Sequence, residues 1–116
     1  MNKYRDKSDF EINKAVADEL IQSGFIIGVE YHDKHILVMD KYANNYPFDP
    51  CNNPADAMPI VIRSLISLIS DKSDDGESAW WVAQDVTGSI ASGLKSNPYR
   101  AAMEVFLMMK EAENES

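Results

Sequence analysis

Proline is concentrated in one stretch of this chain, and that stretch limits what the chain can fold into. Four of the five prolines and the only cysteine lie within residues 46–59. A proline lacks a backbone N–H and disfavours the helical conformation in the residue before it, so we expect residues 48–52 to form a shaped loop. Asn53 and Pro54 are typical of a helix start, and Asp56 adds negative charge to its first turn. A rigid loop that ends at exposed helix N–H groups is a common place for ligands and partners to bind.

The length and composition predict one folded domain. A chain of 116 residues buries about two-thirds of its surface on folding, which is enough for a core without disulfides or metals. The hydrophobic fraction of 45% and the charged fraction of 26% are ordinary for globular proteins. We expect a single domain over residues 1–116, with flexible ends at 1–7 and 112–116. No apolar run of about 18 residues and no leader-like N-terminus are present, so we expect a soluble protein of the cytoplasm that makes no membrane contact.

The charge balance argues against nucleic-acid binding. The formal net charge is −8, and the eleven basic residues are scattered rather than clustered, whereas phosphate contacts need grouped Lys and Arg. Acidic residues gather in 71–77 and in the C-terminal tail, and we interpret them as solubilising rather than as a DNA mimic. A lone cysteine cannot form an intramolecular disulfide and lacks the spacing of a zinc site, so we expect no metal and no cofactor.

Local patterns predict an α+β fold. Ser8 and Glu11 form a capping box, and Asn97 with Pro98 repeats the helix-start pattern of Asn53 and Pro54. The expected helices cover residues 9–22, 54 to about 65, and 99–111, and the expected strands cover 25–31, 35–40, a short segment from about 66, and 78–84. We therefore expect a small antiparallel sheet of three to four strands packed with about three helices.

Three features of these elements bear on burial. In the helix from Pro54, the apolar residues Met58, Ile62, Leu65, Ile66 and Ile69 share one stripe, opposite Arg63, Ser67 and Ser70. The last helix is polar chiefly along Arg100, Glu104 and Glu111, which predicts a helix at the centre of the fold or half of a homodimer interface. Adjacent strand residues point to opposite faces, so Trp80 and Trp81 cannot share a core layer. Helices over both faces, a dimer seam or a ligand platform would cover the second Trp.

Three separated pieces of the sequence support a family resemblance. They are Ser8-Asp9-Phe10-Glu11-Ile12-Asn13-Lys14; Phe48-Asp49-Pro50-Cys51-Asn52 with Ala55-Asp56-Ala57 and Pro59-Ile60-Val61; and Asn97-Pro98 with Arg100-Ala101-Ala102-Met103 and Val105-Phe106-Leu107-Met108-Met109. In this order the chain resembles the NinX-like proteins of tailed bacteriophages and enterobacterial prophages. The resemblance implies a phage accessory protein, and it brings no catalytic residues with it.

Cys51 is the strongest catalytic candidate. A Cys near a helix N-terminus can have a lowered pKa, and Asp49 or one of the histidines His32 and His35 could activate it. A Cys in a small domain is more often a packed apolar residue, so we expect no catalytic residue and keep Cys51 as a weak candidate. A metal site built from His32, Asp33, His35 and Asp49 is a weaker candidate still.

A binding surface is the preferred functional interpretation of the proline-rich loop. Its candidate residues are Phe48, Asp49, Cys51, Asn52, Asp56, Trp80, Trp81 and Arg100. Arg100 beside aromatic groups could hold a carboxylate or phosphate, but we favour an internal ion pair with Asp49 or Asp56. The Asp and Asn side chains of the loop are expected to close turns and cap the second helix.

The sequence therefore predicts a non-enzymatic accessory protein that acts in the host cell cytoplasm. Its expected partner is a host or phage protein, bound by a homodimer. The first alternative is a small-ligand binder, for a nucleotide-like metabolite, with residues 48–56 as its wall. The second alternative is a cysteine-dependent enzyme that uses Cys51.

Overall fold

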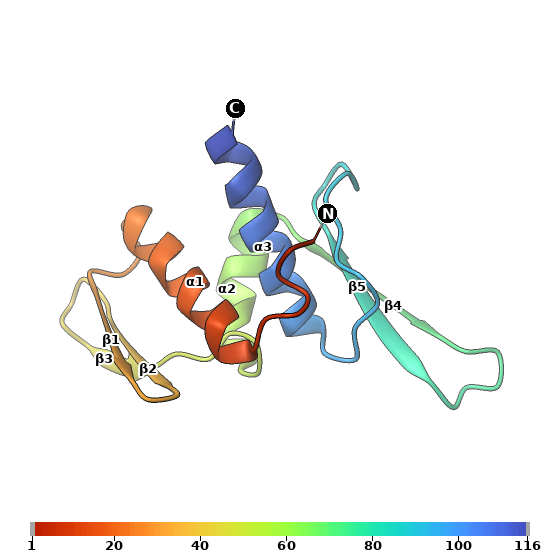
Figure 1. Ribbon diagram of the computed structural model, residues 1–116, viewed down its shortest axis with the longest axis horizontal. Helices are drawn as coiled ribbons and strands as arrows, with labels where there is room; N and C mark the ends of the chain where they lie inside the picture. The colour runs from red at the N-terminus through yellow and green to blue at the C-terminus, as the bar shows by residue number, and fades with distance from the viewer. Residues whose placement is uncertain (1, 116) are drawn as a thin grey trace.

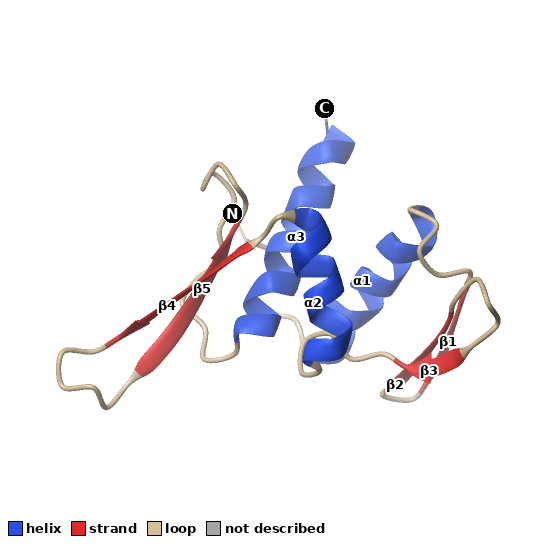
Figure 2. Cartoon of the chain, turned by 180° about the vertical axis from the view of Figure 1, so that it is seen from behind, coloured by secondary structure: helices blue, strands red, loops and turns tan. Residues whose placement is uncertain are grey.

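The computed structural model describes residues 2–115 and has an α+β fold, as predicted (Figure 1). In chain order its elements are α1 (Asp9–Gln22), β1 (Gly28–His32), β2 (His35–Met39), β3 (Asn45–Pro47), α2 (Pro54–Ser64), β4 (Ser67–Lys72), β5 (Ala79–Gln84) and α3 (Pro98–Glu115). The helices form a central group, with strands at either end of the molecule (Figure 2).

The strands belong to two antiparallel sheets within residues 2–115, where the sequence predicted one. The first sheet has the order β1-β2-β3, and the second is the hairpin β4-β5. The helix α2 connects the two sheets in the chain and belongs to the group of helices between them (Figure 1). The strand β4 therefore begins on the side of that group away from the first sheet (Figure 1). Leu65 then turns the backbone with a left-handed φ of 57°. The strand predicted from about residue 66 is confirmed as β4.

The N-terminal helix follows the sequence prediction at both ends. Ser8 Oγ accepts a hydrogen bond from the Glu11 N–H at 3.1 Å, and the Ser8 N–H donates to Glu11 Oε1 at 3.3 Å, which is the predicted capping box. Gly24 has a φ of 83° just beyond the last turn. Ile12, Val16 and other residues at helical spacing pack into the core from this helix.

The last helix lies at the centre of the fold. It contacts α1, α2 and the second sheet, and every residue from Ala101 to Leu107 is buried. This confirms the central burial predicted from its apolar circumference. The helix continues to Glu115, beyond the predicted end at 111, and residues 2–7 form hydrogen-bonded turns beside it. The flexibility expected at 1–7 and 112–116 stays a prediction, and residues 1 and 116 lie outside the described part of the chain.

The second helix buries a different face from the one that the sequence suggested. Ala57, Ile60 and Val61 face the core, whereas Ile62 and Leu65 are 67% and 64% exposed. The helix α2 has two apolar stripes, and α3 covers only the one that contains Ala57, Ile60 and Val61. Periodicity alone cannot decide which of two apolar stripes meets a neighbour.

The two tryptophans lie on opposite faces of the β4-β5 hairpin. Leu68 pairs with the fully buried Ala83, so the face that carries Ala83 and Trp81 packs toward α3. Trp80 lies on the other face, where the described chain places no helix (Figure 1). Part of the connector between β5 and α3 pairs with this sheet, since the backbone of Lys95 exchanges hydrogen bonds with that of Trp81.

Candidate functional site

The proline-rich loop is held from α1 by one buried side chain. Asn13 donates from Nδ2 to Asp49 Oδ1 at 2.6 Å and accepts at Oδ1 from the Cys51 N–H at 3.0 Å. Asn13 is only 5% exposed, so these bonds satisfy an amide that would otherwise be costly to bury. The loop is therefore a folded part of the protein, as predicted.

The same loop is held from α2 and α3 by capping side chains. Asn53 caps α2 by accepting from the Ala55 N–H at 3.0 Å, and Asp56 accepts from the Asp49 N–H at 2.9 Å. Asn97 caps α3 and also donates to the Cys51 carbonyl at 2.6 Å. The predicted caps at Asn53 and Asn97 are confirmed, and together with Asn13 these side chains tie the loop to α1, α2 and α3.

Arg100 is occupied inside the protein, but its partners differ from the predicted Asp49 and Asp56. Its Nη1 lies 2.6 Å from Asp9 Oδ1, and its Nε lies 2.7 Å from Glu104 Oε2. Its Nη2 donates to the carbonyls of Tyr4 and Lys7 at 2.9 and 2.7 Å. The guanidinium thus joins the N-terminal turns to α3, and its donors are taken by protein groups.

Glu104 is fully buried and would be costly without partners. Besides Arg100, it accepts from Asn2 Nδ2 at 2.6 Å and lies 3.2 Å from Lys95 Nζ. Two cations and an amide compensate the buried carboxylate, as burial of a charge requires. This cluster is structural, since its polar atoms are directed at one another.

Cys51 does not meet the condition that would make it a nucleophile. Its side chain is fully buried, and burial, followed by the nearby Asp9 charge, raises the pKa of the thiol. A reactive cysteine needs the opposite shift and access to substrate. Its Sγ lies 3.9 Å from the Asp9 carbonyl oxygen, to which it donates.

The structure does not bring the eight predicted site residues together. Phe48 and Asp56 line a cleft between the helices, whereas Asp49 and Asn52 line a hollow on the other side of the loop, beside His35. Cys51 and Arg100 belong to the interior contacts described above. Trp80 and Trp81 lie on β5, across α3 from the loop (Figure 1).

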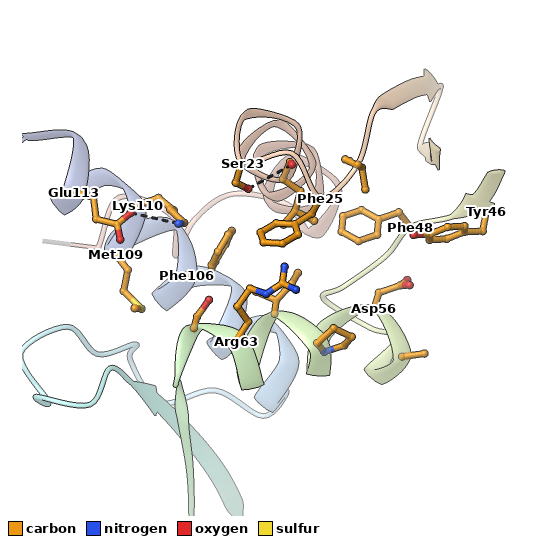
Figure 3. A pocket seen from close by; sticks show the side chains of 16 residues that line it. Ser23, Phe25, Tyr46, Phe48, Asp56, Arg63, Phe106, Met109, Lys110 and Glu113 are labelled. Carbon is orange, nitrogen blue, oxygen red and sulfur yellow. Dashed lines mark hydrogen bonds and ion pairs between the residues drawn. The ribbon is translucent and has the colours of Figure 1, made fainter. Parts of the chain in front are cut away.

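The cleft has aromatic walls from separate parts of the chain (Figure 3). It has a volume of about 430 Å³, within the usual range of small-molecule sites. Phe25 follows α1, Phe106 belongs to α3, and Tyr46 and Phe48 come from β3 and the residue after it. Pro59 and Ile60 of α2 also line it.

Arg63 is the charged group at the centre of this cleft, and sequence analysis missed it. Its guanidinium carbon lies 3.4 Å from the centroid of the Phe25 ring, so the guanidinium lies flat on that ring. The Arg63 side chain makes no hydrogen bond or ion pair with any residue in 2–115. Lys110, the other cation in the wall, lies 3.3 Å from Glu113. The 37 residues between Phe25 and Arg63 hide this contact from any local pattern, although Arg63 does fall on the polar stripe of its helix.

A second exposed feature lies on the outer face of α2. Met58, which is half-buried against the core, Ile62 and the C-cap residue Leu65 follow one another at helical spacing. Met58 and Ile62 line a shallow groove with Pro54, Pro59 and Arg63. Ile69 of β4 is 46% exposed and lies just beyond the helix. This apolar surface, Met58, Ile62, Leu65 and Ile69, is called the α2 stripe below.

Among residues 2–115, no three His, Cys, Asp or Glu side chains gather closely enough to hold a metal ion. None of the helices described has the length and apolar character needed to cross a bilayer.

The fold and these surfaces define a small α+β domain with an aromatic cleft and an exposed apolar helix face. The family described as Bacteriophage P22, NinX matches residues 3–110. The chain therefore belongs to this phage family, which confirms the resemblance seen in the sequence. No curated protein and no solved structure matches the chain.

Proposed function

We propose that this phage-encoded protein is a non-enzymatic accessory protein that binds a host or phage protein in the host cytoplasm through the α2 stripe. The observation that carries the proposal is the exposure of Ile62 and Leu65 on a helix whose opposite face is core. Isolated exposed apolar residues are common, but a contiguous row on one helix is typical of an interaction site. Such a row can enter a groove of a partner at successive turns.

The acidic character of the chain favours a particular kind of partner. The end of β4 and the turn that follows it, at the outer end of the hairpin away from α2 (Figure 1), carry Asp71, Asp74, Asp75 and Glu77, all exposed, with Lys72 as the only base among them. A partner that contacts both surfaces would present an apolar patch to the α2 stripe and, apart from that patch, Lys and Arg side chains to the hairpin. The net charge of −8 on each copy opposes self-association, so we propose a basic partner rather than a second copy of this chain.

Capture from phage-infected cells tests the proposal when variants are compared. Ile62→Lys places a charge in the stripe, and Val86→Lys is the matched control, since Val86 is 71% exposed on the loop after β5. We expect the wild type and Val86→Lys to recover the same stoichiometric basic protein, and Ile62→Lys to recover about tenfold less, because an interface charge without a partner costs more than 1 kcal/mol.

Two outcomes would contradict the proposal. Equal recovery by all three proteins would place any interface elsewhere. A concentration-dependent dimer in sedimentation that Ile62→Lys converts to monomer, with no other protein captured, would assign the stripe to a homodimer instead.

A further inference from the structure

We propose that the cleft centred on Arg63 is a binding site for a small organic anion that joins a flat ring to one carboxylate or phosphate group. This site goes beyond the proposed protein interface, because the cleft is formed chiefly by Phe25, Phe48 and Phe106, which are not part of the α2 stripe.

Arg63 is held in place by Phe25, and the N–H donors of its guanidinium have no partner in residues 2–115. At 3.4 Å from the ring centroid, the guanidinium has to lie parallel to Phe25, since a tilted guanidinium would force a nitrogen into the ring. Its N–H groups point outward within that plane, toward the cleft (Figure 3). A planar guanidinium with free edges binds carboxylate or phosphate through paired hydrogen bonds, and stacking reduces the entropy lost on binding.

Arg63 has no acidic partner within residues 2–115, although the chain is rich in acidic residues. The sequence has 19 acidic and 11 basic residues. Within residues 2–115, Lys3, Lys95, Arg100 and Lys110 pair with carboxylates, whereas Arg63, which is exposed, and the other Lys and Arg residues do not. Arg63 makes no such pair within the described chain. Asp56 lines the same cleft, but one of its oxygens accepts the Asp49 N–H. A ligand carboxylate or phosphate would supply the missing partner.

The walls of the cleft are largely aromatic and suit a flat ring. Three phenylalanines surround the position of Arg63, with Tyr46 at the rim (Figure 3). Aromatic side chains favour stacked or edge-on contacts with a second ring. Lys110 at one end adds positive charge that Glu113 partly balances. A flat ring carrying a single anionic group fits these walls better than a long flexible acid or a polyanion.

Two pairs of probes test the inference on the full chain. Indole-3-acetate is compared with neutral indole-3-acetamide, and adenosine monophosphate with adenosine, by titration followed in amide NMR spectra. For at least one pair we expect the anion to bind about tenfold more tightly than its neutral partner, as a charge-assisted hydrogen bond implies. The largest shifts should fall on residues around Phe25 and Arg63. The pair that binds distinguishes an aryl carboxylate from a nucleotide.

Variants separate Arg63 from general charge effects. Arg63→Gln should reduce the affinity for the anion to that for the neutral compound and leave the neutral compound unchanged. Lys14→Gln is the matched control, since it removes the same charge from a cation that lies over Tyr31, outside the cleft. Ile62→Lys should retain ligand binding, so failure of the protein interface would not remove this site.

The inference is overturned by any of three results. These are equal affinity for anion and neutral compound in both pairs, no loss of anion affinity in Arg63→Gln, or no binding of any probe at millimolar concentration.

Discussion

Asn97 caps α3 and, with the same amide, donates to the carbonyl of Cys51, 46 residues earlier in the chain. A helix cap alone contributes about 1 kcal/mol, and a buried carbonyl left without a donor adds about 1–3 kcal/mol. We therefore predict that Asn97→Ala lowers the free energy of unfolding by about 2–4 kcal/mol. Urea denaturation followed by circular dichroism measures this change.

Two further variants separate the two roles of Asn97, which are the cap of α3 and the hydrogen bond to the Cys51 carbonyl. Asn97→Asp retains an acceptor for the cap but loses the donor to Cys51, so its stability should lie between those of wild type and Asn97→Ala. Asn53→Ala removes a cap that has no second role and should cost only about 1 kcal/mol. Equal losses for Asn97→Ala and Asn53→Ala would show that the bond to Cys51 contributes nothing.

Arg100→Lys is predicted to loosen the N-terminal turns. Lys retains the charge near Glu104 but cannot reach Asp9 and the carbonyls of Tyr4 and Lys7 with one planar group. Limited trypsin digestion should then cut after Lys7 several times faster than in wild type. Cleavage after Lys72, in the distant hairpin, is the internal control and should not change. Equal acceleration at both sites would indicate global destabilisation instead.

Local signals in the sequence were enough to place the helices. The capping box at Ser8 and the Asn-Pro pairs at Asn53 and Asn97 each marked a helix start that the structure confirms. These signals act within a few residues and need no tertiary information. The strand β3 was missed because Asn45-Tyr46-Pro47 is short and ends in proline, which is tolerated here because β3 lies at the edge of its sheet.

The candidate sites depend on contacts that no local pattern encodes. Arg63 meets Phe25, and Arg100 meets Asp9, across long stretches of chain. The sequence suggested an Arg beside aromatic groups as an anion site, and the structure offers that arrangement at Arg63 rather than at Arg100. Residue type was thus informative. The choice between Arg63 and Arg100 depended on the tertiary packing that places Phe25 against α2 and Asp9 against α3.

Cys51 is predicted to be unreactive in the folded protein. Because burial raises the pKa of its thiol, the thiolate fraction at pH 8 is far below that of an exposed Cys. We expect the reaction with Ellman's reagent at pH 8 to be roughly 100-fold slower or more than in 6 M urea. Rapid reaction without denaturant, at a rate comparable to that of a free thiol, would restore Cys51 as a candidate nucleophile.

Asp56 is predicted to make stability depend on pH in a specific direction. Burial raises the pKa of its carboxyl above the ordinary 3.8, although the Asp49 N–H opposes the shift. A folded-state pKa above the unfolded value means that the folded protein binds the proton more tightly, so this group's contribution is present at low pH. It is lost as the pH rises from about 3.8 through the raised pKa.

Asp56→Asn tests that dependence, since the amide can still accept from the Asp49 N–H but does not ionise. The free energy of unfolding of the variant minus that of wild type should become more positive between pH 3.5 and pH 7. Urea denaturation at several pH values measures this difference. Asp40→Asn is the control with the opposite sign, because hydrogen bonds from the Asn44 backbone, despite slight burial, lower the pKa of Asp40. A difference for Asp56→Asn that is constant with pH would mean that the Asp56 carboxyl titrates alike in the folded and unfolded chains.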